Sequence, residues 1–273
     1  MFSEVEKIAL MAGKFLLEKK KGLKEIKPSY KENEGLVSEV DLESEKLIQD
    51  ELSRLFPDHF FLGEEGTFEN EDNFYLAKKA KHCWYVDPLD GTNNYLNNLD
   101  YYCVSIAHST DGVIDYGIIY APERDELYYA EKGKGSFYKN LRTGEVEKLD
   151  IKNYTQRPLN RSFAVTSLNS LGGKGREKLE AFYEINNTCL SERRFGSAAL
   201  ELCHTARGMF DVCWDFGLKP WDVNAGLLIC EEAGYSTLNF SGEKVDPLDT
   251  SMLCVRKHLE KDILGILKKI FFK

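Results

Sequence analysis

In the segment at residues 84–92 (WYVDPLDGT), an apolar run ends in two carboxylates, Asp87 and Asp90, which Gly91 and Thr92 follow at once. Hard divalent cations prefer oxygen ligands, and phosphate groups bind well to the free amides of a helix N-terminus. This one short segment therefore offers both halves of a metal-dependent phosphate site.

Three further acidic positions, Asp41, Glu64 and Asp222, stand where strands are predicted to end or helices to begin. Each has a purely structural explanation when taken alone, because an acidic residue can cap a helix or form a turn. Asp87 and Asp90 are harder to explain in this way, since two carboxylates held close together repel each other unless a cation or a proton intervenes. A metal ion is the simplest explanation of the joint pattern.

Histidine does not join these acidic positions in the sequence. Oxygen ligands alone suit Mg²⁺, whereas zinc sites normally include histidine or cysteine. The five histidines are scattered along the chain, which argues against a zinc site: His59, His82, His108, His204 and His258.

Helices followed by antiparallel strands are predicted for the N-terminal part. Apolar residues at helical spacing predict helices over 3–21 and 42–56, with Asp41 as the N-cap of the second. A buried strand over 83–86 leads into the two carboxylates. The alternation and turn residues of 102–139 predict an antiparallel meander.

A change of pattern divides the chain into two halves. Residues 67–82 are charged and lack periodicity, which predicts a loop or an irregular helix, and residues 140–160 are polar and rich in turn formers. Strands and helices alternate beyond that point, as is typical of an α/β arrangement. We therefore expect an N-terminal α+β half over 1–150 and a C-terminal α/β half over 151–273, which could also form one continuous domain.

The composition limits the partners and the compartment. The 273 residues carry a net charge of −9, which argues against nonspecific binding to nucleic acid or to an acidic membrane. The seven cysteines form no CxxC pair and mostly lie in apolar runs, as expected of reduced, buried thiols. No segment has the length of a membrane span, and the N-terminus lacks the pattern of a signal peptide, so we expect a cytoplasmic protein.

Several of these segments together resemble the inositol monophosphatase family, within the larger group of Mg²⁺-dependent, lithium-sensitive phosphatases. Residues 63–66 (GEEG) look like its GEE motif, and residues 87–92 (DPLDGT) look like its DPxDGT motif. Residues 221–226 (WDVNAG), with 231–234 (EEAG), are similar to its C-terminal signature, and residues 37–41 (VSEVD) to its N-terminal motif. The matches occur in the family's order and cover most of the chain.

The resemblance implies the ligands of two to three Mg²⁺ ions. Glu64, Asp87 and the backbone carbonyl of Leu89 would bind one ion. Asp87, Asp90 and Asp222 would bind a second. Glu64, directly or through water, would help to hold a third.

The resemblance also implies how water and phosphate are handled. The amides of Gly91 and Thr92 would hold phosphate oxygens, and Thr92 with Asp41 would orient or deprotonate the attacking water. The predicted catalytic residues are therefore Asp41 and Thr92, together with the metal carboxylates Glu64 and Asp87.

The substrate would be selected by residues that follow the metal core. By the family match, Gly196, Ser197 and Ala198 would line the pocket, although helix capping explains them almost equally well. Asp215 stands where many family members carry a Glu that binds polyol hydroxyls, and its side chain is one methylene shorter. Arg194 could pair with a second phosphate or could form only a surface salt bridge.

The resemblance implies a layered α-β-α-β-α sandwich of mixed α+β and α/β class, assembled as a homodimer. It implies a Mg²⁺-dependent phosphomonoesterase that acts on small polyol or sugar phosphates such as inositol 1-phosphate. The alternatives are a fructose-1,6-bisphosphatase, a dual enzyme for both substrates, or a nucleotide bisphosphate phosphatase. A non-enzyme alternative is an accessory protein that binds nucleic acid or protein on a phosphatase fold, but an inactive relative should have lost a metal carboxylate.

Overall fold

The structure is a computed structural model and describes residues 2–22, 29–31, 35–37, 39–67, 72–168 and 174–272. Its helices are α1 (Phe2–Lys20), α2 (Glu39–Leu55), α3 (Glu64–Thr67), α4 (Asp72–Lys79), α5 (Thr92–Leu96), α6 (Gly175–Thr188), α7 (Ala198–Ala206), α8 (Pro220–Glu232) and α9 (Glu260–Phe271). Its strands are β1 (Ser29–Lys31), β2 (Gly35–Val37), β3 (Phe60–Gly63), β4 (His82–Asp90), β5 (Cys103–Thr110), β6 (Val113–Ala121), β7 (Glu126–Glu131), β8 (Gly135–Asn140), β9 (Val146–Leu149), β10 (Phe163–Val165), β11 (Ser191–Arg193), β12 (Val212–Phe216), β13 (Ser236–Leu238) and β14 (Ser251–Val255). Two short 3-10 turns, Ile151–Asn153 and Leu159–Arg161, connect β9 to β10.

Two sheets carry the fold. The seven-stranded sheet has the order β3-β4-β5-β6-β7-β8-β9, in which β3 and β4 are parallel and every later pair is antiparallel. The predicted meander is therefore confirmed. The five-stranded sheet has the order β11-β10-β12-β14-β13, with β10 parallel to both of its neighbours. The strands β1 and β2 pair separately.

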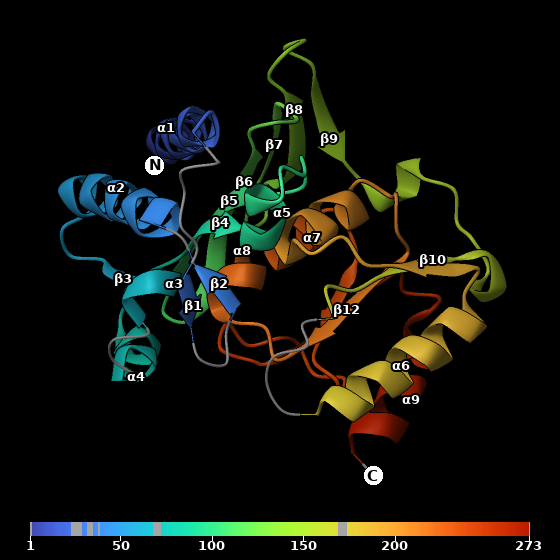
Figure 1. Ribbon diagram of the computed structural model, residues 1–273. Coiled ribbons are helices and arrows are strands. Elements are labelled where there is room, and N and C mark those ends of the chain that lie inside the picture. Colours follow the sequence, from blue (N-terminus) through green and yellow to red (C-terminus); the bar gives the residue numbers. More distant parts are fainter. Residues whose placement is uncertain are drawn as a thin grey trace.

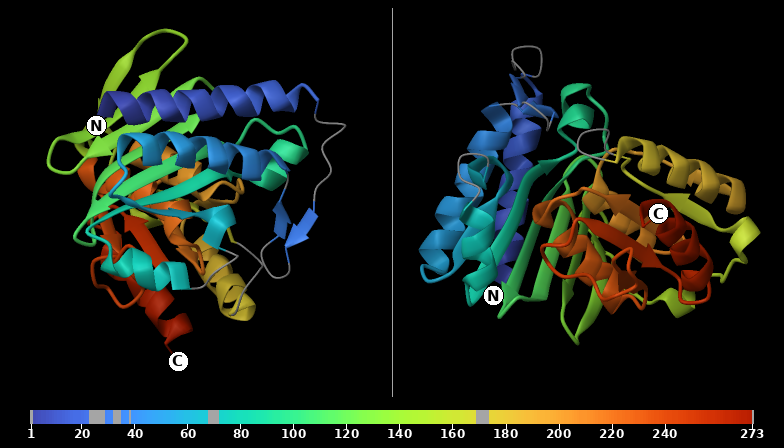
Figure 2. Two further views of the ribbon diagram at one scale, coloured as in Figure 1. Left: turned by 90° about the vertical axis from the view of Figure 1, so that its left-hand side faces the viewer. Right: turned by 90° about the horizontal axis from the view of Figure 1, so that it is seen from below.

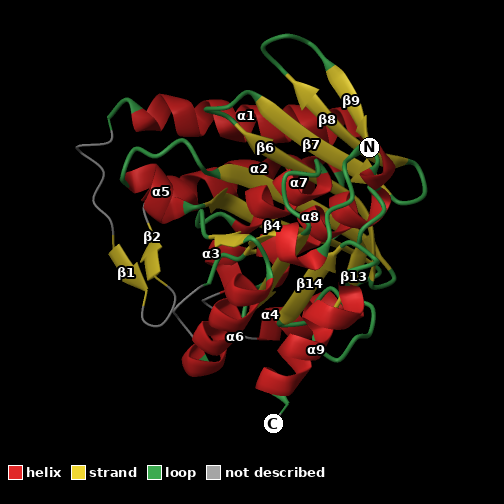
Figure 3. Cartoon of the chain, turned by 90° about the vertical axis from the view of Figure 1, so that its right-hand side faces the viewer, coloured by secondary structure: helices red, strands yellow, loops and turns green. Residues whose placement is uncertain are grey.

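Helices alternate with the two sheets to make five layers (Figures 1 and 2). Helices α1 and α2 share a hydrophobic core with one face of the seven-stranded sheet. Helices α7 and α8 share a second core with the other face and with the five-stranded sheet, and α6 and α9 close the outer face of that sheet. Figure 3 shows α1 at one end of the molecule and α6 with α9 at the other. This arrangement is the expected α-β-α-β-α sandwich.

Alternation along β4 explains how one strand serves two cores. Trp84 and Val86 pack toward α1 and α2, whereas Cys83 and Tyr85 pack toward α7 and α8. Successive side chains of a strand point to opposite faces, so a strand buried on both faces is apolar throughout. The apolar run before the two carboxylates therefore reflects a central strand.

Several predicted element boundaries were wrong. Helix α2 begins at Glu39, so Asp41 lies in the first turn instead of capping the helix, where its negative charge is favourable to the helix dipole. Residues 72–79 form the regular helix α4, which packs through Phe74 against Trp221 with ring centroids 5.8 Å apart. The polar stretch near 140–160 includes β9, an edge strand, and edge strands tolerate polar residues.

All seven cysteines are free and buried, as the sequence predicted. Burial raises the pKa of most of these thiols, for example Cys103, Cys203 and Cys213, which makes them poor nucleophiles. Across the described residues, every helix is too short or too polar to cross a lipid bilayer.

Candidate active site

The end of β4 departs from regular strand geometry where the two carboxylates stand. The register against β5 shifts between Asp87 and Asp90, so the ladder is interrupted at Pro88 and Leu89. Pro88 has no amide hydrogen to donate to a neighbouring strand, which suits an interruption. The amide of Leu89 instead donates to Asp87 Oδ1 at 2.9 Å. The backbone thus folds back on Asp87 and fixes its carboxylate.

Four carboxylates share this end of β4. Burial raises the pKa of Asp87, and the negative charges of Glu64, Asp90 and Asp222 raise it further. The predicted metal ligands are therefore brought close enough to interact, although they come from three separate parts of the chain. Asp87 itself is 2% exposed.

The neighbouring elements explain why these side chains meet. Strand β3 lies parallel to β4 with Gly63 opposite Val86, so Glu64 emerges at the same end of the sheet as the Asp87 carboxylate. Asp222 stands in the first turn of α8, where its Oδ2 accepts a 2.7 Å hydrogen bond from the Lys219 amide. The Ser105 hydroxyl donates to the carbonyl of Trp221 at 3.1 Å and holds the start of α8 against β5.

Asp90 is held by the N-terminus of α7. Its Oδ2 accepts hydrogen bonds from the Ser197 hydroxyl at 2.7 Å and from the Ala199 amide at 2.8 Å. Burial raises the pKa of Asp90, and these bonds oppose that effect by stabilising the ionised form. Ser197 and Ala198 are themselves buried. The Ser197 hydroxyl thus contacts the Asp90 carboxylate and the Cys103 sulfur.

Thr92 links the carboxylate cluster to α2. Its hydroxyl lies 2.8 Å from Asp41 Oδ1 and 3.1 Å from the Leu89 carbonyl oxygen. Gly91 precedes it with a φ of +97°, and a Cβ there would lie 2.9 Å from the Tyr101 carbonyl oxygen. Only glycine meets both conditions without strain. The tight turn lets α5 begin at Thr92.

The predicted substrate residues lie on the side of the five-stranded sheet. Arg194 is exposed, and its Nε donates to the Ser167 carbonyl at 2.6 Å. Asp215, on β12, is buried and accepts amide hydrogen bonds from Phe216 at 2.7 Å and Leu168 at 3.1 Å. Burial raises the pKa of Asp215 to about 6, and its negative charge in turn raises the pKa of Asp222. Asp215 therefore adjoins the carboxylate cluster.

A carboxylate on α2 positions helix α3, which carries the predicted ligand Glu64, and sequence reasoning missed it. Glu45 accepts hydrogen bonds from the amides of Glu65 and Gly66, both at 2.7 Å. A Cβ at Gly63 would lie 2.5 Å from the Glu45 carboxyl group. The glycine therefore leaves room for the Glu45 carboxylate to reach the two amides. The available signal was the spacing of Asp41 and Glu45, because residues four apart share a helix face.

The loop before α7 is fixed by two more residues that the sequence analysis did not single out. Asn94 donates to the carbonyls of Tyr101 at 2.7 Å and Phe195 at 2.8 Å. Glu201 accepts from the amides of Phe195 at 2.8 Å and Gly196 at 3.1 Å, and burial raises its pKa to about 8. Gly196 is thereby held within reach of the site.

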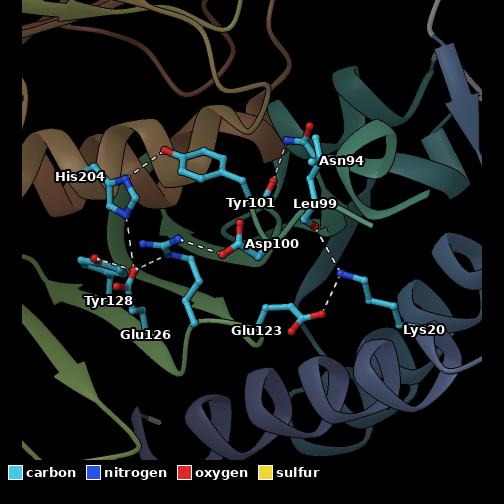
Figure 4. A network of polar contacts seen from close by, with 10 residues as sticks. Lys20, Asn94, Leu99, Asp100, Tyr101, Glu123, Glu126, Tyr128 and His204 are labelled. Atoms are coloured by element: carbon cyan, nitrogen blue, oxygen red, sulfur yellow. Dashed lines mark hydrogen bonds and ion pairs between the residues drawn. The ribbon is translucent and has the colours of Figure 1, made fainter. Parts of the chain in front are cut away.

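A polar network extends from this loop to the seven-stranded sheet (Figure 4). The Tyr101 hydroxyl lies 3.0 Å from His204 Nδ1, and His204 Nε2 lies 3.4 Å from Glu126. The Tyr128 hydroxyl donates to Glu126 at 3.2 Å. The network ties α5, α7 and β7 together, so the elements that frame the site are mutually braced.

The expectation that the histidines are scattered was wrong for three of them. His59, His82 and His108 each place a ring nitrogen within 4.8 Å of the others. They lie at the opposite end of β4 from the carboxylates, and strand pairing brings them together from distant positions in the sequence.

The model of the inositol monophosphatase family matches residues 2–270. The chain belongs to the inositol monophosphatase family. It is 33% identical over 263 residues to an inositol-1-monophosphatase of Rhizobium meliloti, covering 94% of this chain and 92% of that protein. It is also 33% identical to a fructose-1,6-bisphosphatase/inositol-1-monophosphatase of Aquifex aeolicus (98% and 96% covered) and to the Nus factor SuhB of Xylella fastidiosa (89% and 83% covered).

A solved structure gives the same result for the fold. The extragenic suppressor protein suhB of Bartonella henselae superposes with a TM-score of 0.85 at 30% identity, covering 98% of each chain. The predictions of the inositol monophosphatase family and of its layered sandwich fold are confirmed. Membership of the inositol monophosphatase family also confirms the prediction of an enzyme of the phosphoric monoester hydrolase type.

Proposed function

We propose that the chain is a Mg²⁺-dependent phosphomonoesterase that hydrolyses inositol 1-phosphate and similar small polyol or sugar phosphates by attack of water. The observation that carries this proposal is the burial of Asp87 among the charges of Glu64, Asp90 and Asp222. Burying this much negative charge is costly unless cations or protons compensate it. Because all the donors are oxygens, the site fits Mg²⁺ better than a softer metal.

The proposed ligands follow from the family match. Glu64, Asp87 and the Leu89 carbonyl would hold one ion, and Asp87, Asp90 and Asp222 a second, with Glu64 contributing to a third. Bound there, the ions would neutralise phosphate charge, make a water more acidic and stabilise the leaving oxygen.

Thr92 and Asp41 would prepare the attacking water. The Thr92 hydroxyl donates to Asp41, which leaves oxygen lone pairs that can accept a hydrogen bond from water. As the water attacks phosphorus, its proton would pass to Thr92 while the threonine proton passes to Asp41. The amides of Gly91 and Thr92 would hold the phosphate oxygens, at the N-terminus of α5.

The choice of substrate would lie with Arg194, Asp215 and the segment from Gly196 to Ala198. One relative is named as an inositol-1-monophosphatase, and another is named for both fructose 1,6-bisphosphate and inositol 1-phosphate. These names support a polyol phosphate as the first candidate substrate and fructose 1,6-bisphosphate as the second. Arg194 favours the second candidate, because its exposed guanidinium could pair with another phosphate. A nucleotide bisphosphate is a third candidate on the same argument.

The non-enzyme alternative keeps some support from the likeness to a Nus factor SuhB. The presence of Glu64, Asp87, Asp90 and Asp222 supports the enzyme instead. We further propose a cytoplasmic, lithium-sensitive homodimer, as the family resemblance implies. Seven free, buried thiols suit a reducing compartment.

A phosphate-release panel tests the proposal. The full chain is assayed with inositol 1-phosphate, fructose 1,6-bisphosphate, an adenosine bisphosphate and histidinol phosphate, each with Mg²⁺ and with a chelator. We expect Mg²⁺-dependent release that is fastest from inositol 1-phosphate. Faster release from fructose 1,6-bisphosphate would favour the second candidate, and release from none of the four would contradict the proposed function.

A further inference from the structure

The histidine cluster lies on a part of the sheet that the phosphatase chemistry does not use. His82 opens β4, whereas Asp87 stands five residues later on the same strand, about 17 Å away at the usual strand rise. The two groups also face opposite sides of the sheet. His82 shares with Trp84 the face toward α1 and α2, because the two residues are two positions apart on the strand. Asp87 is three positions from Trp84, so its side chain points to the other face. Any ion bound by the histidines would be separate from the carboxylate site.

Strand pairing explains why the three imidazoles meet. In the antiparallel pair of β4 and β5, Trp84 lies opposite His108 and His82 lies opposite Thr110, so these side chains share one face. Strand β3 runs parallel to β4 with Phe60 opposite Cys83. His59 therefore enters the sheet level with His82 and on the same face.

Asp115 orients the cluster from the next strand. The pairing of β5 with β6 shifts register between His108 and Ser109, which leaves Asp115 as the extra residue of a bulge. Its Oδ1 lies 2.7 Å from His108 Nδ1, and its Oδ2 accepts a 2.6 Å hydrogen bond from the Thr110 hydroxyl. The Thr110 oxygen lies 3.3 Å from His82 Nδ1. One carboxylate thus orients two imidazoles, one directly and one through a hydroxyl.

These contacts indicate which nitrogens face one another across the cluster. Since Asp115 accepts from His108 Nδ1, the lone pair of His108 is on Nε2, where it accepts a 3.2 Å hydrogen bond from His59 Nδ1. A cation between the two nitrogens would take the place of that shared proton. Two nitrogens of a tetrahedral zinc site, with Zn–N bonds of about 2.0–2.1 Å, lie about 3.3 Å apart. A carboxylate behind a ligating imidazole is a common arrangement in metal sites.

We propose that His59, His82 and His108 form a second metal site, distinct from the carboxylate cluster, that binds a transition-metal ion such as Zn²⁺ through three imidazole nitrogens. His108 is fixed by Asp115 and by its packing on Trp84, with ring centroids 4.5 Å apart. The half-buried rings of His59 and His82 stack with centroids 4.6 Å apart. Both rings would have to turn to complete the ligand set. The fourth position would take water. The bound ion would tie the start of β3 to β4 and β5.

Zinc binding to the full chain tests the site. The protein is stripped of metal with a chelator, placed in excess Mg²⁺ to occupy the carboxylates, and titrated with Zn²⁺ by calorimetry. We expect one Zn²⁺ per chain, and Co²⁺ in its place should give the intense visible absorption of a tetrahedral site. His59→Gln and His82→Gln should each weaken binding about tenfold or more, and Asp115→Asn should weaken it by about 10- to 100-fold.

His258→Gln is the matched control, because His258 is exposed and lies outside the cluster, and it should bind Zn²⁺ as the wild type does. Circular dichroism establishes that each variant is folded. His59, which precedes β3, offers a second variant should substitution of His82 disturb the strand. A wild type that binds no Zn²⁺ in excess Mg²⁺, or folded His59 and His82 variants that bind it unchanged, would overturn the proposal. Neither result depends on phosphatase activity.

Discussion

The hydroxyl of Thr92 lies 2.8 Å from a carboxylate oxygen of Asp41, although 51 positions separate the two residues. Asp41 is almost fully buried in the first turn of α2, and Thr92 begins α5 just after the end of β4. The pair therefore joins the outer helical layer to the carboxylate cluster. In the proposed mechanism it receives the proton of the attacking water.

Removing the Thr92 hydroxyl tests this relationship. Thr92→Ala should lower kcat for inositol 1-phosphate by about 10²- to 10⁴-fold, the usual contribution of a positioned proton acceptor. Thr92→Ser, which keeps the hydroxyl, should retain most of the activity. Steady-state phosphate release at saturating Mg²⁺ measures both variants. Equal activity of the alanine and serine variants would exclude a role for the hydroxyl.

Ser197→Ala should weaken Mg²⁺ binding through Asp90. The Ser197 hydrogen bond lowers the pKa of Asp90, so its loss raises that pKa and reduces the ionised fraction that a cation needs. We expect half-saturating Mg²⁺ to rise about tenfold, and more at pH 6 than at pH 8. Ser241→Ala, at an exposed position, is the control. A Mg²⁺ dependence that matches the wild type at both pH values would argue against this role.

The carboxylate cluster should couple stability to pH and to Mg²⁺. Burial raises the pKa of Asp87, Asp90 and Asp222, so without metal the folded chain binds protons more tightly than the unfolded chain. Their protonation stabilises the fold at low pH, and this contribution is lost as pH rises from their ordinary pKa of about 4 toward the raised values.

Because Mg²⁺ would take the place of those protons, the rise in Tm on adding Mg²⁺ should be larger at pH 8 than at pH 5.5. Thermal unfolding with Mg²⁺ and with a chelator at the two pH values measures it. Asp90→Asn should show a smaller rise. A rise that is the same at both pH values would mean that the cation does not bind these carboxylates.

Gly91 allows a direct comparison of backbone strain with close packing. Gly91 and Gly144 have φ values of +97° and +76°, but only a Cβ at Gly91 would meet other atoms, and one at Gly144 would meet none within 4 Å. Gly144→Ala should cost about 1–2 kcal/mol of unfolding free energy from the left-handed backbone alone. Gly91→Ala should cost more and should also lower kcat. Denaturant unfolding of both variants measures the difference in their free energies of unfolding. Equal losses would show that the close contact between the new Cβ and the Tyr101 carbonyl is relieved by a local shift.

The sequence predicted local features of the site better than long-range ones. The buried strand over 83–86 that leads into Asp87 follows from local residues alone, and the predicted ligands Glu64 and Asp222 lie near Asp87 as the family motifs imply. The roles of Ser197 and Glu45 could not be predicted, because each depends on contact with a segment far away in the sequence.

The same limit explains the errors in the fold. The edge strand β9 and the helix α4 have weak patterns of their own and are stabilised by neighbouring elements. The histidine cluster was missed because it depends on the register between β3, β4 and β5, which periodicity does not determine.

Phosphate release from inositol 1-phosphate by the wild type and by Asp90→Asn, each with and without Mg²⁺, tests the central claim most directly. Asp50→Asn, an exposed position on α2, serves as the control for loss of a carboxylate. We predict Mg²⁺-dependent release by the wild type and the control, and a folded Asp90 variant that is slower by several orders of magnitude. Near-wild-type release by the Asp90 variant, or release by the wild type that does not need Mg²⁺, would contradict a metal-dependent phosphatase site at these carboxylates.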